Sequence, residues 1–99
     1  MTEKQFQVRK TEDFDKWLKA LKDLKAKGII IRRLNAIATT GNFGKHKQLK
    51  GQKNMFELII DYGQGYRIYY KMLSGVIVIT IGGGIKKDQK KDIKRLSKK

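Results

Sequence analysis

The stretch ELIIDYGQGYRIYY, residues 57–70, has apolar and aromatic residues on both sides of a loop that contains two glycines. Strand-like patterns cover residues 55–60 and 66–73, so we expect the loop to join two β-strands. Arg67 then lies at the start of the second strand, which is rich in aromatic residues. A cation beside a glycine loop, in a chain of net charge +15, indicates a surface that binds a polyanion.

The chain after this stretch predicts a third strand and a helix. Residues 76–81 have a strand pattern, and the short link Ser74-Gly75 before them predicts a hairpin. We expect the glycine run 82–84 to end that strand as a flexible turn, where the backbone can approach a ligand. Residues 86–96 then predict a helix. The residues expected on its inner side are Gln89, Ile93 and Leu96.

The chain before this stretch predicts a short strand over residues 6–8 and two helices. Thr11 can cap the first helix, Gly28 is expected to interrupt the helical pattern, and residues 30–38 form a second apolar stripe. Residues 39–44 have the composition of a loop. The apolar face expected for the first helix consists of Phe14, Trp17, Leu18, Leu21 and Leu24.

This order of elements predicts an α+β fold. We expect a small single domain over residues 1–99, in which an N-terminal strand and a helical hairpin pack on an antiparallel sheet that is followed by a short C-terminal helix. The helices should lie together on one face of the sheet.

The composition favours a nucleic-acid-binding function. Lysine and arginine number 24 against 9 acidic residues, and the excess is spread over both halves of the chain. Basic domains of this kind most often bind nucleic acid, although charge that serves solubility alone is the alternative. Membrane-surface binding by the last helix would need a larger apolar face than Ile93 and Leu96 supply.

Other function classes are excluded by the residues that the chain lacks. It has no cysteine, which excludes disulfides and thiolate sites, and its one histidine, His46, argues against a histidine metal site. The sequence has no apolar run long enough to span a bilayer, and its first fifteen residues do not resemble a signal peptide. These features predict a cytoplasmic protein with no cofactor, no metal and no membrane partner.

Four blocks of sequence resemble the RelE superfamily of toxins from bacterial toxin–antitoxin modules, and most closely its HigB-like branch, the addiction module killer proteins. They are VRKTEDFDKWL at residues 8–18, GNFG at 41–44, the stretch 57–70, and a closing motif at 83–93 that contains Gly83-Gly84, Lys86 and Gln89-Lys90-Lys91-Asp92-Ile93. The match covers nearly the whole chain.

The resemblance implies RNA chemistry. RelE-type toxins are mRNA endoribonucleases that cut in the decoding site of the ribosome without a metal, and a cognate antitoxin, in this branch of the helix-turn-helix type, holds them inactive. The expected partners are therefore this antitoxin, the ribosome and mRNA. A non-catalytic basic module that binds nucleic acid or a partner, as an attenuated toxin would, is the alternative function.

The resemblance also assigns roles to residues. Arg67 would stabilise charge on the phosphate, with Lys86 and Lys87 as further cations. Apart from the resemblance, the lone His46 is a candidate acid–base group, because an imidazole suits that chemistry. The structural alternatives are a surface Arg67 paired with an acidic neighbour such as Asp61 or Glu57, a solvated helix start and an exposed histidine. The expected RNA contacts are Lys45, Lys47, Lys50, Lys53, Tyr66, Lys90, Lys91 and Lys94.

Three residues depart from the pattern of the branch. Ile59 stands where the branch usually has arginine, Gln64 replaces a proline, and Ile85 replaces an aspartate. The first departure removes a cation from the strand next to Arg67. Either Lys53, Lys86 or Lys87 offsets the loss for substrate binding or catalysis, or the chain is an attenuated toxin.

Overall fold

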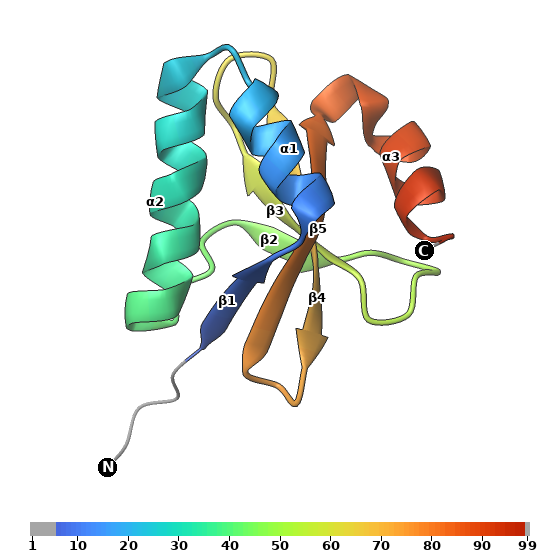
Figure 1. The fold of residues 1–99 in the computed structure, drawn as a ribbon. Coiled ribbons are helices and arrows are strands. Elements are labelled where there is room, and N and C mark those ends of the chain that lie inside the picture. Colours follow the sequence, from blue (N-terminus) through green and yellow to red (C-terminus); the bar gives the residue numbers. More distant parts are fainter. Residues whose placement is uncertain (1–5, 99) are drawn as a thin grey trace.

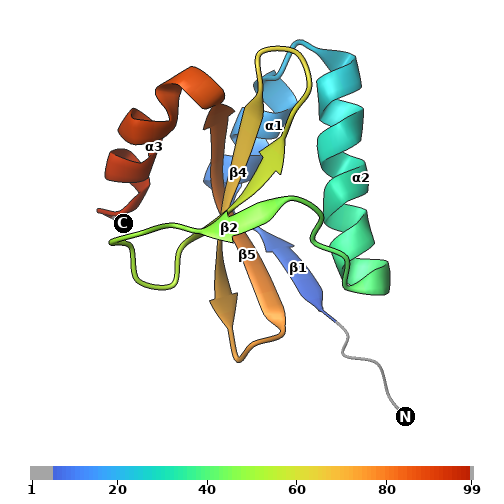
Figure 2. The same ribbon diagram turned by 180° about the vertical axis from the view of Figure 1, so that it is seen from behind.

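A five-stranded sheet in the order β1-β5-β4-β3-β2 is the centre of the computed structural model, which describes residues 6–98 (Figure 1). Helices lie on both of its faces, as the two opposite views show (Figure 2). The elements are β1 (Gln7–Lys10), α1 (Glu12–Ala20), α2 (Leu24–Thr40), β2 (His46–Gln48), β3 (Phe56–Ile60), β4 (Tyr66–Leu73), β5 (Ile77–Ile85), the 3-10 turn η1 (Lys86–Asp88) and α3 (Gln89–Leu96).

The α+β class is confirmed, but the sheet is mixed rather than purely antiparallel. Strand β1 pairs with β5 in parallel, with Gln7 opposite Ile77, whereas β2, β3, β4 and β5 pair in antiparallel order. The predicted hairpin between β4 and β5 is present. Ser74 and Gly75 both have positive φ, 53° and 70°, as a tight two-residue turn requires.

The predicted break at Gly28 was wrong. Gly28 lies inside α2, which begins at Leu24 and is capped by the side chain of Asp23. Leu24 is therefore not on the apolar face of α1, and its side chain is 76% exposed. One glycine inside a helix costs only about 1 kcal/mol relative to alanine, which the apolar face of α2 offsets.

The predicted loop after the second helix also begins later than expected. Helix α2 continues to Thr40 and ends at Gly41, whose φ of 73° is the left-handed conformation that closes many helices. Threonine is common in loops, but here the hydroxyl of Thr40 donates to the carbonyl of Ala36, one turn earlier in the helix.

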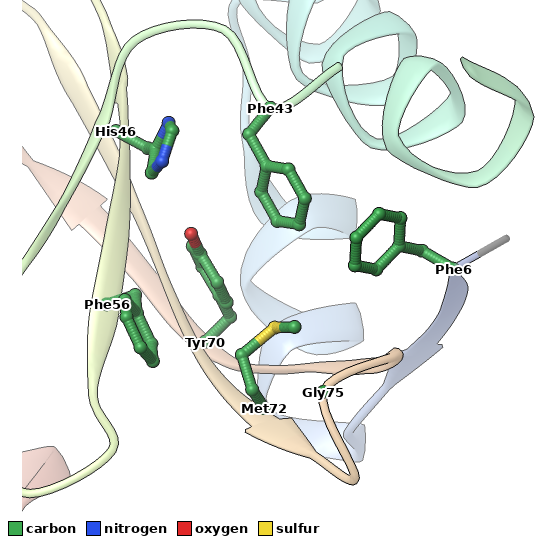
Figure 3. Close-up of a pocket in the computed structure, with 7 residues that line it drawn as sticks. All are labelled: Phe6, Phe43, His46, Phe56, Tyr70, Met72 and Gly75. Atoms are coloured by element: carbon green, nitrogen blue, oxygen red, sulfur yellow. The ribbon is translucent and has the colours of Figure 1, made fainter. Parts of the chain in front are cut away.

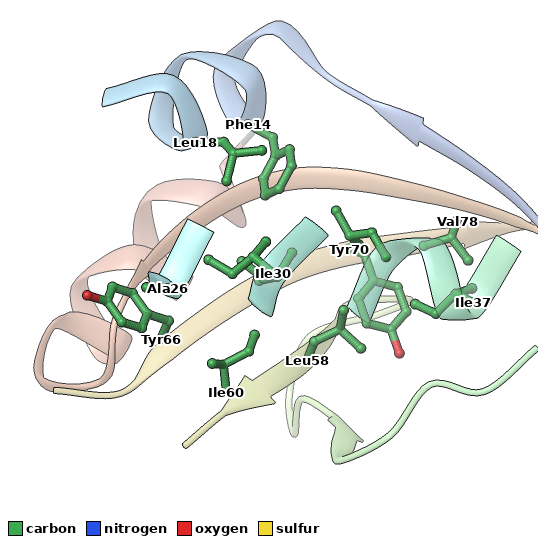
Figure 4. Close-up of a cluster of buried hydrophobic side chains, with 12 residues drawn as sticks. Phe14, Leu18, Ala26, Ile30, Ile37, Leu58, Ile60, Tyr66, Tyr70 and Val78 are labelled. Carbon is green, nitrogen blue, oxygen red and sulfur yellow. The ribbon is translucent and has the colours of Figure 1, made fainter. Parts of the chain in front are cut away.

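The main core lies between the sheet and the α1–α2 pair (Figure 4). Tyr66 belongs to it and is 2% exposed, so its ring presents no face on which an RNA base could stack. The buried residues of this core are Phe14, Leu18, Ala26, Ile30, Leu34, Ile37, Leu58, Ile60, Tyr66, Ile68, Tyr70 and Val78.

Helix α3 packs on the opposite face of the sheet, so the expectation that all helices lie on one face was wrong. Its Leu96 is fully buried in a second, smaller core with Leu49, Met55 and Tyr69. Ile93 packs against the same core, which confirms the predicted inner side of this helix.

The glycine run 82–84 is the interior of β5 and not a turn. A Cβ atom at Gly83 would overlap the ring of Trp17 in α1, and one at Gly82 would lie 2.9 Å from the side chain of Leu96 in α3. Since successive residues of a strand point to opposite faces, these glycines let helices approach the sheet closely from both sides. Within residues 6–98, no helix is long and apolar enough to cross a membrane.

We predict that Gly83→Ala lowers the free energy of unfolding by about 1–3 kcal/mol, because the new methyl group overpacks against Trp17. Gly28→Ala is the matched control. Only Arg32 lies near its Cβ position, at 3.8 Å, so this substitution should stabilise α2 by about 0.5–1 kcal/mol. Urea denaturation measures both changes. Equal stability of Gly83→Ala and the unsubstituted protein would contradict the packing described here.

Candidate active site

Three charged side chains lie on the sheet face that α3 covers in part. The register pairs Lys47 with Glu57 and Ile59 with Arg67 across three neighbouring strands. Leu58 faces the main core, so its neighbour Glu57 points to the other side. The alternation of the strands therefore brings Lys47, Glu57 and Arg67 to one face.

Glu57 and Arg67 form a buried ion pair. The distance from Arg67 Nε to Glu57 Oε1 is 3.7 Å, and the two side chains are 9% and 0% exposed. Arg67 Nη1 donates a hydrogen bond to the carbonyl of Tyr66, at 3.1 Å. The pairing of Arg67 with Glu57, which the sequence left open, is present, but the pair is buried and not on the surface.

Two further side chains contact the Glu57 carboxylate from other elements. The amide Nε2 of Gln89, in the first turn of α3, donates to Oε1 at 2.7 Å. Lys47 Nζ lies 3.4 Å from Oε2 as an ion pair that lacks the alignment of a hydrogen bond. Because the Lys47 side chain is 58% exposed, it connects this buried carboxylate with the solvent.

The polar cluster continues toward α3. Tyr69 is fully buried, and burial, with the nearby carboxylates of Asp92 and Glu57, raises its pKa. Four buried polar atoms of the cluster have no hydrogen-bond partner among the described residues: Glu57 Oε2, Arg67 Nε, Tyr69 OH and Asp92 Oδ2. Unpaired buried polar atoms are rare in folded proteins and are found at sites that bind or react.

Further cations lie around the carboxylate of Asp61, which follows β3. Lys45 Nζ donates to its carboxylate at 2.7 Å, and this hydrogen bond lowers the pKa of Asp61, with the charges of Lys45, Arg67 and Lys86 adding to the effect. The backbone of Lys86 is held by the carbonyl of Gly65, at 3.0 Å. Of the predicted site residues, Arg67, Lys45, Lys47 and Lys86 are thus brought together.

Arg33 of α2 fixes the segment that leads into β2. Its guanidinium donates to the carbonyls of Ile59, Phe43 and Lys45 at 2.9, 3.0 and 2.9 Å. These bonds join the helix, the loop after it and β3, and so set the position of Lys45 beside Asp61.

His46 lies on the other face of the sheet from Arg67. It belongs to the edge strand β2 and not to a loop, and it pairs with Leu58, which faces the main core. Its Nδ1 is 2.7 Å from the carbonyl of Gly44. The sheet therefore separates His46 from Arg67, and the two cannot act on one phosphate.

His46 instead lines an aromatic hollow of about 250 Å³ (Figure 3). The rings of Phe56 and Tyr70 stack on one side of it, with centroids 5.4 Å apart, and Phe43 and Phe6 meet edge to face at 5.0 Å. The lining residues are Phe6, Phe43, His46, Phe56, Tyr70, Met72 and Gly75. This hollow is apart from the charged cluster.

The remaining predicted cations lie on the outer surface. Lys50 and Lys53 are exposed in the loop between β2 and β3. The other predicted site cations that are exposed lie in η1 and α3, and they are Lys87, Lys90, Lys91 and Lys94. Within residues 6–98, no three histidine, aspartate or glutamate side chains are grouped so that they could hold a metal ion.

Glu57 is the main residue that sequence reasoning missed as a site candidate. Its signal was its place in the apolar strand FELII, where an acidic residue has no reason to be buried unless it has a partner. Arg67 was already considered as a partner from the sequence, whereas Gln89 lies on α3, which the strand pattern alone cannot bring to Glu57.

Comparison with known proteins gives one relative in sequence and several in fold. No protein-family model matches the chain. The chain is 47% identical over 89 residues to an uncharacterized protein of Haemophilus influenzae, which covers 90% of this chain and 87% of that protein.

Solved structures that are similar in fold include a RelE toxin and RelBE toxin–antitoxin complexes. A mutant of Escherichia coli toxin RelE in the free state superposes with a TM-score of 0.66 at 17% identity, over 92% of this chain and 97% of that one. A chain of the intact E. coli RelBE toxin–antitoxin complex gives a TM-score of 0.64 at 18% identity, over 81% of this chain and 95% of that one. The RelBE2 toxin–antitoxin complex of Mycobacterium tuberculosis gives 0.63 at 15% identity, over 83% and 99%. The RelE-like fold predicted from the sequence is confirmed.

We predict that Glu57→Ala lowers the free energy of unfolding by about 3 kcal/mol, because it leaves the charge of Arg67 buried without its partner. Glu12→Ala is the control, since the Glu12–Lys16 pair is 3.0 Å long but exposed, and its loss should cost less than about 1 kcal/mol. If urea denaturation gave similar decreases in the free energy of unfolding for both variants, the buried pair would contribute no more to stability than the exposed one.

A second prediction concerns Tyr70, whose pKa burial raises to about 12 from an ordinary value of 10.0. The folded state keeps the neutral phenol, so its contribution to stability is complete below pH 10 and is lost as the pH rises from 10 through 12. Between pH 10 and 11, Tyr70→Phe should lose less stability than the unsubstituted protein, by about 1 kcal/mol, because the unfolded phenol is only half ionised at pH 10. Parallel pH dependences of unfolding would contradict this.

Proposed function

The chain belongs to the same protein family as its Haemophilus influenzae relative and has the RelE fold, and from this premise we propose that it is the toxin of a bacterial toxin–antitoxin module. We propose further that it is an endoribonuclease that cuts mRNA on the ribosome and so stops translation. The observation that carries this proposal is the meeting of Arg67, Glu57 and the surrounding lysines on one face of the sheet.

These residues suit cleavage by the 2′-hydroxyl of RNA. In that reaction the 2′-oxygen bonds to phosphorus, the bond from phosphorus to the 5′-oxygen breaks, and a 2′,3′-cyclic phosphate and a 5′-hydroxyl result. Arg67 would stabilise the charge on the phosphate, and the carboxylate of Glu57 would accept the proton of the 2′-hydroxyl. Lys86 would give a proton to the departing 5′-oxygen. His46 has no part in this scheme, because it lies across the sheet.

The exposed lysines would hold the RNA backbone. Lys50 and Lys53 of the β2–β3 loop, and Lys87 on η1, would contact phosphates of mRNA or ribosomal RNA. The outer surface of α3 would add the contacts of Lys90, Lys91 and Lys94.

A cognate antitoxin is the proposed partner, since two of the similar structures are toxin–antitoxin complexes. A net charge of +15 favours an acidic segment in that antitoxin. The HigB-like branch, the helix-turn-helix type of antitoxin, a single toxin domain over residues 1–99 and a cytoplasmic site of action remain predictions from the sequence.

A non-catalytic RNA-binding module is the second candidate function. Ile59 pairs directly with Arg67 in the register, so the cation that this branch usually has there is missing from the position beside Arg67. The burial of Arg67 and Glu57 also favours this candidate, since substrate must displace what covers them.

We predict that Arg67→Lys lowers the rate of mRNA cleavage on programmed ribosomes by about 10²-fold, because lysine keeps the charge beside Glu57 but loses the planar fork. Arg9→Lys, the same change at an exposed arginine of β1, should leave the rate unchanged. Primer extension on a defined mRNA maps the cut.

The outcomes separate the two candidate functions. Cleavage that Arg67→Lys removes supports the toxin as an enzyme. If the mRNA stays intact although the protein binds ribosomes with a steep salt dependence, the binding module is supported. Ile59→Arg would then be the first substitution to test for restored cleavage.

A further inference from the structure

The closing motif of the sequence contains Gln89, whose role the proposed reaction leaves open. Gln89 begins α3 and donates its side-chain amide to Glu57 Oε1 at 2.7 Å. The same oxygen lies 3.7 Å from Arg67 Nε, which is beyond hydrogen-bond distance. The close partner of this buried carboxylate is therefore a neutral amide and not the guanidinium beside it.

This arrangement is unusual for a carboxylate next to an arginine. Buried arginine–carboxylate pairs usually close to hydrogen-bond distance, often with two parallel bonds. Here Arg67 Nε is buried and has no hydrogen-bond partner among the described residues. A carboxylate that moved about 1 Å closer would take this donor and neutralise the arginine within the protein.

The position of Gln89 is fixed from both ends of α3. At the far end, Leu96 is fully buried in the smaller core. At the near end, a Cβ atom at Gly84 would overlap the carboxylate of Asp92, so the missing side chain lets this turn of the helix lie close to β5. The sheet and the helix together hold the Gln89 amide over Glu57.

We propose that Gln89 is a positioning residue that holds the Glu57 carboxylate away from Arg67, so that Arg67 Nε keeps its hydrogen for a phosphate oxygen of the RNA. This inference rests on the proposed function for its catalytic consequence. Its structural part, that Gln89 keeps the ion-paired Glu57 carboxylate beyond hydrogen-bond distance of Arg67 Nε, stands on the geometry alone.

The test compares Gln89→Met with the unsubstituted protein. Methionine has a similar length and no donor, so Glu57 should close onto Arg67. The rate of cleavage on saturating ribosomes should fall by about tenfold or more, with less than about a twofold change in ribosome affinity. Gln48→Met, at an exposed glutamine of β2, is the matched control and should change neither quantity.

A spectroscopic measurement follows Arg67 without reference to cleavage. The Nε–H resonance of Arg67 in ¹⁵N-labelled protein should move downfield in Gln89→Met, because a new hydrogen bond to Glu57 forms. An unmoved resonance would overturn the structural part of the proposal. If the unsubstituted protein cuts no mRNA, the proposed function fails, and this resonance still decides whether Gln89 positions Glu57.

A double substitution guards against a purely structural effect. Glu57→Gln combined with Gln89→Glu exchanges the amide and the carboxylate and keeps a hydrogen bond between the two side chains. If Gln89→Met fails to fold, this pair should still fold and should not cut mRNA, because the carboxylate no longer lies at residue 57. Full cleavage by the exchanged pair would overturn the proposal.

Discussion

The close contact of two helices with a single strand is the constraint on which the rest of the structure depends. Strand β5 receives α1 on one face and α3 on the other, and the glycine run 82–84 makes room for both. Because α1 and α2 then pack on one face, the larger apolar core forms there. The other face is covered in part by the short α3, which leaves its charged residues at the boundary between a small core and the solvent.

Much of the fold could be predicted because its signals are local. The strands on either side of residues 61–65 and the turn at Ser74-Gly75 follow from patterns within a few residues. The errors at Gly28 and at the glycine run 82–84 have one physical cause. A glycine is permissive everywhere, so whether it breaks an element or admits a neighbour is decided by residues distant in sequence, such as Trp17 for Gly83.

In the candidate site, too, the residues with a local sequence signal could be predicted and those that depend on distant contacts could not. Arg67 could be singled out from the sequence because it follows a glycine loop in a resembling motif, and its neighbours Lys45, Lys47 and Lys86 do gather near it. That His46 faces away could not be foreseen, since this depends on the pairing of β2 with β3 across a loop. Glu57 was missed because its importance comes from a contact with Gln89, 32 residues later in the chain.

The parallel pairing of β1 with β5 has a consequence for the synthesis of the protein. Gln7 and Ile77 are partners, so the first strand to leave the ribosome waits for nearly the last one before the sheet can close. Contacts between such distant residues slow folding, because a long loop must be ordered before they form. Strand β1 therefore stays without this partner during synthesis until β5 has been made, and the sheet closes only when residues 70 positions apart in the chain meet.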